Sequence, residues 1–178
     1  GKTMGLAPMG DASTYYDKVS KMVRVDKNGQ LQFDLSYFNF QNMHWQRLSP
    51  KFYEEFGPGR KHGEDFQKHH RDMAAAFQRV LEDRVLEICD ILYQKTKAEY
   101  LVISGGVSLN SVMNGRIVRE SKFKDVYVMP AAGDNGTAIG AAYYLYNGIF
   151  GKPRNFVHLD PYVGTSYTNE EIEKVLKG

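Results

Sequence analysis

Two segments of the sequence contain residue types that suit a nucleotide or a phosphate. The first, SGGVSLN at residues 104–110, follows an apolar run and precedes a helical pattern. Gly105 and Gly106 would let a ligand approach the backbone closely, and the N–H groups at the start of a helix attract phosphate. Asn110 could hydrogen-bond a ribose or a phosphate. The alternative interpretation is a tight strand-to-helix turn without a ligand.

The second segment, PAAGDNGTAIG at residues 130–140, also lies between a strand pattern and a helix pattern. Asp134 in this segment would project at the carboxyl end of the sheet, where open α/β folds bind ligands. A carboxylate there can bind a divalent metal that bridges phosphates. Alternatively, Asp134 or Asn135 caps the next helix, and the small residues serve close helix packing.

Three further features carry residues with reactive or charged groups. Lys2 lies in the opening segment GKTMGLAPMG and could hold a phosphate as a point charge, although a solvated lysine is the alternative. Cys89 lies beside an apolar helical stripe, so we expect a buried, unreactive thiol. His69 and His70 are adjacent and would point about 100° apart on a helix, so they could not face one metal, and we expect both at the surface.

The first half of the chain must supply a hairpin and a long helix. Residues 22–25 and 30–33 alternate around an Asn-Gly turn, which predicts a β-hairpin. Residues 37–66 are aromatic and broken by proline and glycine, which predicts irregular structure with Trp45 in a satellite core. We expect Asp72 to cap the longest helix, whose apolar positions recur at three- and four-residue steps.

The second half alternates between strands and helices. Strand patterns at residues 100–104 and 126–129 are followed by helix patterns at 109–120 and 135–146. This alternation predicts parallel pairing, and Thr168 with Glu171 predicts a capping box at the start of a final helix. We therefore expect an α/β fold with one mixed sheet, an N-terminal hairpin and helices packed on it.

Composition narrows the class of protein. The chain has 178 residues, of which 42% are hydrophobic and 25% charged, which suits one ordinary domain. Its 23 basic and 21 acidic residues are spread along the chain, so we expect no nucleic-acid partner. No apolar run reaches the roughly 18 residues of a membrane span, and nothing reads as a signal peptide, so we expect a cytoplasmic protein. The sequence lacks an initiator methionine and stops just after a helix signal, which we interpret as a fragment of a longer protein.

Four motifs occur in a fixed order: GKTMGLAPMG, HRDMAAAFQRVLE, LVISGGVSLNSVMNGRI and VYVMPAAGDNGTAIGAA. In this order they resemble the large carbamoyltransferases, which include nodulation-type and antibiotic-tailoring O-carbamoyltransferases. The resemblance covers most of the chain. It implies that residues 1–164 are part of an actin-like carbamoyl-transfer domain, half of a ribonuclease-H-like fold of the actin-like ATPase superfamily. Residues 165–178 would then begin a linker or a second domain.

The resemblance also implies a reaction. Such enzymes form carbamoyl adenylate from carbamoyl phosphate and ATP, and then pass the carbamoyl group to the hydroxyl of a small acceptor. Carried over by motif, Asp134 would bind a divalent metal, iron or magnesium, with a histidine pair that precedes this chain. The expected nucleotide-binding residues are Gly105, Gly106, Val107, Asn110 and Lys2. Because a carbamate-activating domain would follow the chain, we expect the isolated chain to be inactive.

Two other interpretations remain open at this stage. One is another actin-like nucleotide-binding protein, such as a sugar kinase or a tRNA threonylcarbamoyl-transfer protein. The other is a non-catalytic nucleotide-binding module, which the missing metal ligands favour. The sequence assigns no catalytic base, because no histidine or carboxylate has a spacing that identifies one.

Overall fold

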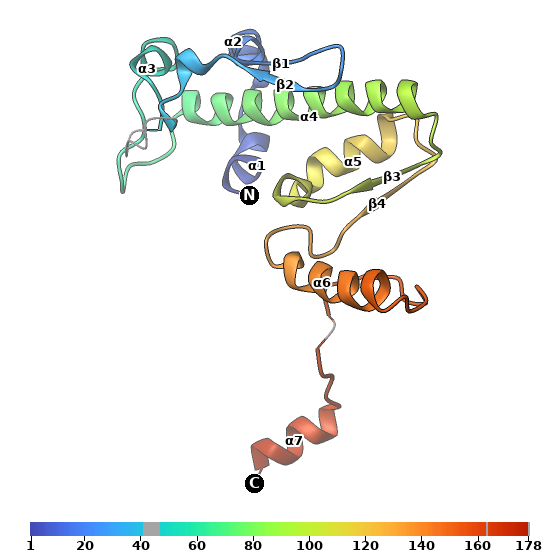
Figure 1. Cartoon of the computed structure of the whole chain (residues 1–178). Helices are drawn as coiled ribbons and strands as arrows, with labels where there is room; N and C mark the ends of the chain where they lie inside the picture. The colour runs from blue at the N-terminus through green and yellow to red at the C-terminus, as the bar shows by residue number, and fades with distance from the viewer. Residues whose placement is uncertain (41–46, 163, 178) are drawn as a thin grey trace.

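The computed structural model describes residues 1–40, 47–162 and 164–177 (Figure 1). Trp45, expected in a satellite core, lies outside these residues. No helix among the described residues is both long and apolar enough to cross a membrane. The elements follow one another in this order: α1 (Lys2–Leu6), η1 (Ala7–Met9), η2 (Ala12–Thr14), α2 (Tyr16–Met22), β1 (Val23–Val25), β2 (Leu31–Phe33), η3 (Leu35–Tyr37), α3 (Pro50–Phe56), α4 (Lys68–Thr96), β3 (Tyr100–Ile103), η5 (Gly106–Leu109), α5 (Ser111–Glu120), β4 (Asp125–Val128), α6 (Gly136–Tyr143), η6 (Tyr144–Ile149) and α7 (Asn169–Lys177).

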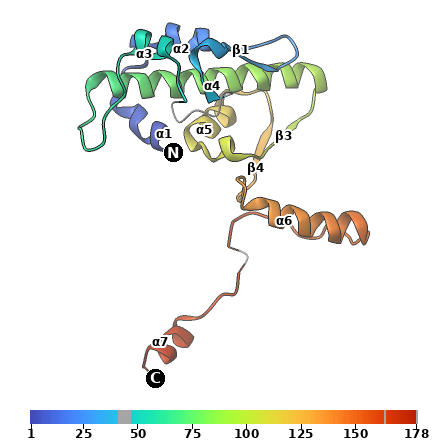
Figure 2. The same ribbon diagram turned by 60° about the vertical axis from the view of Figure 1, so that its left-hand side comes forward.

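Helix α4 is the central element and has 29 residues. In Figures 1 and 2 the hairpin β1–β2 with α2 and α3 lies on one side of α4, and α1, α5, β3 and β4 lie on the other. Buried side chains from the first side form one core with α4: Val19, Met22, Tyr37, Phe52, Phe56, Ala76 and Val80. The aromatic region before α4 thus contributes to this core, with the Phe52 and Phe56 rings stacked at 4.6 Å.

The predicted hairpin is confirmed, but the predicted mixed sheet is wrong. Strands β1 and β2 pair antiparallel, with Val23 opposite Phe33, and the Asp26 carboxylate accepts hydrogen bonds from the turn N–H groups of Asn28 and Gln30. Strands β3 and β4 form a separate parallel pair. The two sheets do not merge because α4 lies between them.

The parallel pair β3–β4 is connected by α5, as the alternating pattern predicts. Ile103 lies opposite Val128 in this pair. One face packs against α4 and α5 in a second core made by Cys89, Leu101, Met113, Ile117 and Phe123. Cys89 is buried as expected, and burial raises the pKa of its thiol, which favours the unreactive protonated form.

The predicted start of α4 is wrong. The helix begins at Lys68 with Gln67 as its N-cap, and the Gln67 side chain and His70 form a capping box. Asp72 lies one turn inside the helix, where its buried carboxylate accepts hydrogen bonds from the Asp11 N–H at 2.9 Å and the Thr14 hydroxyl at 3.3 Å. A carboxylate can accept a hydrogen bond from the N–H of a distant segment as well as from its own helix. The presence of an aspartate at position 72 therefore did not identify the N-cap.

The predicted surface position of His69 and His70 is also wrong. Both residues are half-buried, their ring centroids are 3.8 Å apart, and the Nε2 atom of each ring is buried. Phe66 contacts the His70 ring edge-on and covers part of it.

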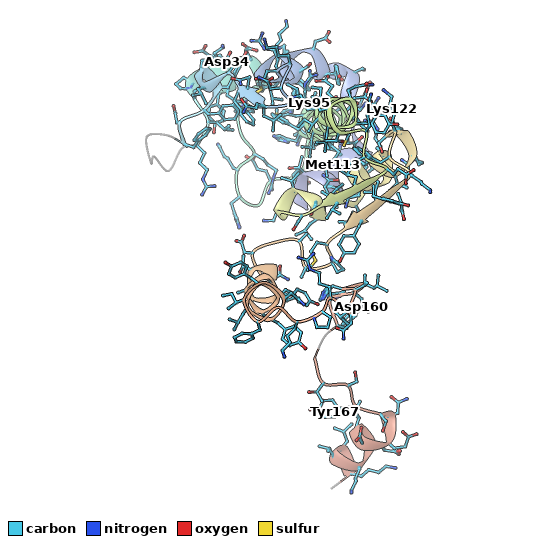
Figure 3. All side chains as sticks on the ribbon, turned by 45° about the vertical axis from the view of Figure 1, so that its right-hand side comes forward. Asp34, Lys95, Met113, Lys122, Asp160 and Tyr167 are labelled. Carbon is cyan, nitrogen blue, oxygen red and sulfur yellow. The ribbon has the colours of Figure 1, made fainter. Side chains whose placement is uncertain are left out.

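From α6 onward the chain extends away from the two cores (Figure 1). None of the described residues of α6, η6 or α7 is buried. In Figure 3, Met113 lies among packed side chains, whereas Tyr167 lies on the segment that leads to α7, far from them. The predicted capping box is confirmed, because the Thr168 N–H donates to Glu171 Oε2 at 2.7 Å and the Glu171 N–H donates to Thr168 Oγ1 at 3.2 Å.

Candidate functional site

Two loops meet at the carboxyl ends of β3 and β4. The Met129 N–H donates to the Ile103 carbonyl at 3.0 Å, which extends the strand pairing by one residue. The Gly105 N–H then donates to the Ala132 carbonyl at 2.9 Å, which joins the loop before η5 to the loop before α6. Parallel strands end at the same edge of a sheet, so both predicted ligand-binding segments lie there together.

Gly105 and Gly136 shape these loops in different ways. Gly105 has a φ of +101°, and an added Cβ would meet no atom within 4 Å, so its conformation requires glycine while the space above it is open. At Gly136 an added Cβ would lie 1.9 Å from the Ala131 carbonyl oxygen. Only glycine therefore lets α6 begin so close to the preceding backbone.

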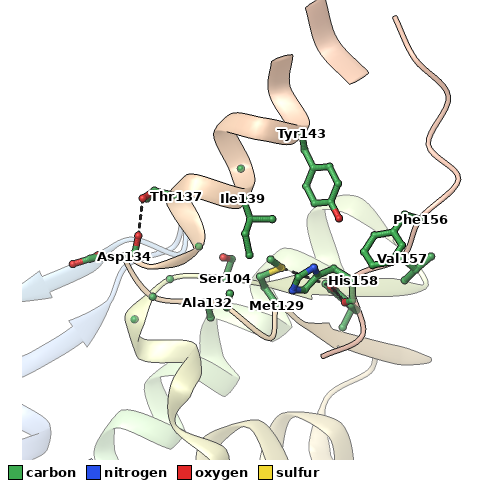
Figure 4. Close-up of a pocket in the computed structure, with 17 residues that line it drawn as sticks. Ser104, Met129, Ala132, Asp134, Thr137, Ile139, Tyr143, Phe156, Val157 and His158 are labelled. Carbon is green, nitrogen blue, oxygen red and sulfur yellow. Dashed lines mark hydrogen bonds between the residues drawn. The ribbon is translucent and has the colours of Figure 1, made fainter. Parts of the chain in front are cut away.

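The two loops border a hollow with a volume of about 720 Å³ (Figure 4). Its lining includes both loops, the first turns of α6 and the segment at residues 156–158. In Figure 4, Asp134 and Thr137 lie at one end, and Phe156, Val157 and His158 lie at the other. The first end is polar and rich in glycine, whereas the second is mainly apolar.

Asp134 lies at the polar end with an exposed side chain. The Thr137 hydroxyl donates to the Asp134 backbone carbonyl at 2.6 Å, and no described residue hydrogen-bonds or ion-pairs with the carboxylate itself. Asn135 is the N-cap of α6, but its side chain makes no capping hydrogen bond. The capping alternative therefore does not account for either side chain.

The predicted metal site is incomplete within this chain. Among the described residues, no group of three or more histidine, cysteine, aspartate or glutamate side chains is placed to bind a metal ion. A single carboxylate such as Asp134 does not make a metal site, because divalent metals take several protein or water ligands. The residues present do not fit a complete metal site, and we assign no chemical step to a metal.

Asn110 has a structural role that its position in the motif did not reveal. It is the N-cap of α5, and its Oδ1 accepts the Met113 N–H at 3.0 Å. Its amide also pairs with that of Gln78 on α4, donating at 2.8 Å and accepting at 3.1 Å. These bonds hold α5 against α4, and Asn110 does not line the hollow.

The other two predicted nucleotide-binding residues also lie outside this hollow. Val107 is 59% exposed on η5. Lys2 borders a different, apolar hollow of about 510 Å³ beside α4, together with Phe66 and His70. The structure thus brings Gly105, Gly106 and Asp134 together, and it leaves Val107, Asn110 and Lys2 outside.

His158 is a site residue that the sequence did not identify. It is only 6% exposed, and its backbone carbonyl accepts a hydrogen bond from the Tyr127 hydroxyl on β4. No local pattern marks residues 153–162, so only the folded chain shows that this segment returns to the end of β4.

Comparisons with known proteins identify relatives of this chain. A family model described as "Carbamoyltransferase N-terminus" matches residues 1–143. The uncharacterized protein sll1178 of Synechocystis is 37% identical over 99% of this chain and 29% of its own length. Nodulation protein NolNO of Sinorhizobium fredii is 32% identical over 82% of this chain and 20% of its own length. Nodulation protein NolO of Bradyrhizobium diazoefficiens is 31% identical over 98% of this chain and 30% of its own length.

A shorter part of the chain is also similar to an enzyme of a second kind. The tRNA N6-adenosine threonylcarbamoyltransferase of Dictyoglomus turgidum is 36% identical over 42% of this chain and 24% of its own length. The chain spans less than a third of the length of each of these relatives. The family model extends over most of the sequence and confirms the resemblance seen in the motifs. The chain therefore belongs to the carbamoyltransferase family, and its residues 1–143 match the N-terminal model of that family.

Proposed function

We propose that the chain is part of an ATP-dependent carbamoyltransferase whose hollow between the two loops binds carbamoyl adenylate during transfer. The observation that carries the proposal is the hydrogen bond from the Gly105 N–H to the Ala132 carbonyl. This bond holds the two glycine-containing loops together, so that Gly105, Gly106 and Asp134 line one hollow. Family membership supplies the group that is transferred.

The polar end of the hollow suits the phosphate of an adenylate. The backbone at Gly105 and Gly106 is open to close approach, since nothing lies within 4 Å of an added Cβ at either residue. The start of α6, at Gly136 and Thr137, borders the same end. The dipole of α6 favours negative charge at this end, while the Gly136 and Thr137 N–H groups themselves donate to the Gly133 and Asp134 carbonyls.

In the proposed reaction, carbamoyl phosphate, water and ATP first yield carbamoyl adenylate, inorganic phosphate and pyrophosphate. The acceptor hydroxyl oxygen then attacks the carbamoyl carbon, and the bond from that carbon to the phosphate oxygen of AMP breaks. AMP leaves with the bonding electrons, and the acceptor loses its proton. The glycine loop and the α6 N-terminus would stabilise the negative charge that develops on the departing phosphate.

We also propose that the chain is part of an actin-like domain. The order of hairpin, long helix, strand, helix, strand and helix is the one expected for half of a ribonuclease-H-like fold. The proposed enzyme would act in the cytoplasm, on a small acceptor with a hydroxyl group, together with the remaining parts of the same protein. A divalent metal, iron or magnesium, would require ligands besides Asp134 from those parts.

Threonylcarbamoyl transfer is the second candidate function. The match to the Dictyoglomus turgidum enzyme favours it, but that match covers 42% of this chain, whereas the carbamoyltransferase model covers residues 1–143. The donor distinguishes the two candidates. A carbamoyltransferase uses carbamoyl adenylate, whereas the second candidate would use a threonylcarbamoyl donor and leave carbamoyl adenylate unconsumed.

The test uses the full-length protein with ATP, carbamoyl phosphate, a divalent metal and a panel of hydroxyl acceptors. Adenylate formation and carbamoyl transfer are measured separately in wild type, in Asp134→Ala and in the control Asp65→Ala, whose exposed carboxylate lies outside the hollow. We expect adenylate in all three proteins and transfer slowed about 100-fold or more only in Asp134→Ala, because Asp134 would be this chain's ligand to the divalent metal that offsets the negative charge on the phosphate.

Two results would contradict the proposal in different ways. If wild type forms no carbamoyl adenylate, the assigned reaction is wrong, and a non-catalytic nucleotide-binding module becomes the better interpretation. If Asp134→Ala transfers as fast as wild type, the reaction stands but this hollow is not where transfer occurs.

A further inference from the structure

The end of the hollow opposite Asp134 contains a buried histidine that the proposed reaction does not use. His158 is 6% exposed, and neither Nδ1 nor Nε2 has a hydrogen-bond partner among the described residues. In Figure 4 its ring lies beside Met129 and Phe156, across the hollow from Asp134. Most buried side-chain nitrogens in folded proteins do have a partner, so two such atoms on one ring require an explanation.

The surroundings hold this ring in place but leave its nitrogens unpaired. The Tyr127 hydroxyl donates to the His158 backbone carbonyl, which ties the segment to β4. The Phe156 ring meets the imidazole edge-on, with centroids 6.1 Å apart and an interplanar angle of 76°. Neutral imidazole offers one N–H donor and one nitrogen acceptor, so a residue that lines the hollow carries a buried donor and a buried acceptor with no partner among the described residues.

The other side chains at this end are apolar or aromatic. Ile139 and Tyr143 extend from α6 toward His158, and Phe156 lies beside it (Figure 4). Flat aromatic and aliphatic surfaces bind the faces of nucleobases, and base edges carry donors and acceptors that match an imidazole. The glycine-rich end, by contrast, suits phosphate. The two ends therefore match the two ends of an adenine nucleotide.

We infer that His158 recognises the edge of the adenine base, while Ile139, Tyr143 and Phe156 contact its faces. This inference rests on the proposed function and adds the residue that selects the base. A role for His158 as the base that deprotonates the acceptor hydroxyl is less favoured, because the ring lies across the hollow from Asp134 and the phosphate-binding loops.

The experiment measures the affinity of the full-length protein for ATP, GTP and inorganic tripolyphosphate by titration calorimetry. The variants are His158→Phe, which keeps a buried ring without nitrogens, and His158→Gln, which keeps one donor and one acceptor. His62→Phe serves as the matched control, since His62 is exposed and lies outside the hollow.

We expect His158→Phe to weaken ATP binding about tenfold, the effect of losing roughly one hydrogen bond, and to reduce the preference for ATP over GTP. Tripolyphosphate binding and melting temperature should stay at the wild-type level, and His158→Gln should retain most of the ATP affinity. His62→Phe should bind all three ligands like wild type.

Each other outcome identifies what is wrong. If wild type prefers ATP and His158→Phe binds it equally well, the inference fails while the proposed function stands. If His158→Phe and His158→Gln both lose ATP and tripolyphosphate to the same extent, His158 is structural and the inference also fails. If wild type binds neither ATP nor tripolyphosphate, the proposed function itself fails.

Discussion

Asp134 and His158 line the same hollow, yet only Asp134 could be predicted from the sequence. Gly105, Gly106 and Asp134 each lie in the loop that follows a strand, so local order along the chain is enough to place them at one sheet edge. Asn110 shares the glycine motif but caps α5 and pairs with Gln78, which lies 32 residues earlier on α4. His158 lines the hollow because its backbone carbonyl accepts a hydrogen bond from Tyr127, 31 residues earlier. Contacts over such separations have no local signature.

Gly136 gives a prediction about stability at the residue scale. Alanine at this position would place its Cβ 1.9 Å from the Ala131 carbonyl oxygen, which is backbone and cannot rotate away. We expect Gly136→Ala to lower the free energy of unfolding by about 1–3 kcal/mol. Gly140→Ala is the control on the same helix, since nothing lies within 4 Å of its added Cβ, and it should raise stability by about 0.5–1 kcal/mol. Urea unfolding of the purified chain measures both, and equal stability of the two variants would show that α6 does not begin as described.

Asp72 gives a prediction about pH dependence. Hydrogen bonds from the Asp11 N–H and the Lys68 ammonium group lower the pKa of Asp72 below its ordinary value of 3.8. A lowered pKa in the folded state means that the carboxylate stabilises the fold above pH 3.8, and that this contribution is lost as the pH falls through the lower value.

We therefore expect Asp72→Asn to be less stable than wild type at pH 7, with a difference that shrinks as the pH falls below 3.8. Urea unfolding of both proteins between pH 7 and pH 2 measures the difference, with the exposed Asp65→Asn as the control. A difference that stays constant down to pH 2 would mean that the Asp72 carboxylate does not make these bonds.

At the scale of elements, α4 and α5 are joined by a cluster of charged side chains. Arg116 on α5 donates to Glu82 at 3.0 Å and to Asp83 at 2.7 Å on α4, and to Glu120 at 2.8 Å on its own helix. The hydrogen bond with Glu120 is the largest cause that raises the pKa of Arg116. Because α5 also carries the Asn110 cap, this cluster helps to position the loop that leads to the hollow.

We expect Arg116→Met to lower the free energy of unfolding by about 3–5 kcal/mol, because it leaves the buried Glu82 carboxylate without its positive partner. Arg119→Met changes an exposed arginine on the same helix and should stay within about 0.5 kcal/mol of wild type. Unfolding in urea measures the free energy of unfolding of both variants. Equal effects would indicate that the ion pairs with α4 do not hold the helices together.

The order of the elements could be predicted from the sequence, but their arrangement could not. Hydrophobic periodicity and turn residues placed the hairpin, the strand pair and the final capping box close to their observed positions. The prediction of a single mixed sheet was wrong because hydrophobic periodicity does not reveal on which side of α4 each strand packs. The predicted N-cap of α4 was wrong because the Asp72 carboxylate accepts a hydrogen bond from Asp11, 61 residues earlier in the chain.

At the scale of the whole molecule, α7 makes the clearest prediction. None of its described residues is buried, and Figure 1 shows it apart from the rest of the chain. Deleting residues 165–178 should therefore leave the melting temperature unchanged within experimental error. A drop of several degrees would show that α7 packs on the remainder, against the proposed boundary near residue 164.

The central claim is that the two glycine-containing loops form one adenine-nucleotide site, and photoaffinity labelling tests it most directly. The full-length protein is irradiated with 8-azido-ATP, with and without excess ATP, and the labelled peptides are mapped by mass spectrometry. The account predicts ATP-sensitive labelling of peptides that contain residues 139–143 or 156–158, which line the base end of the hollow. Labelling that avoids every peptide lining the hollow would contradict it.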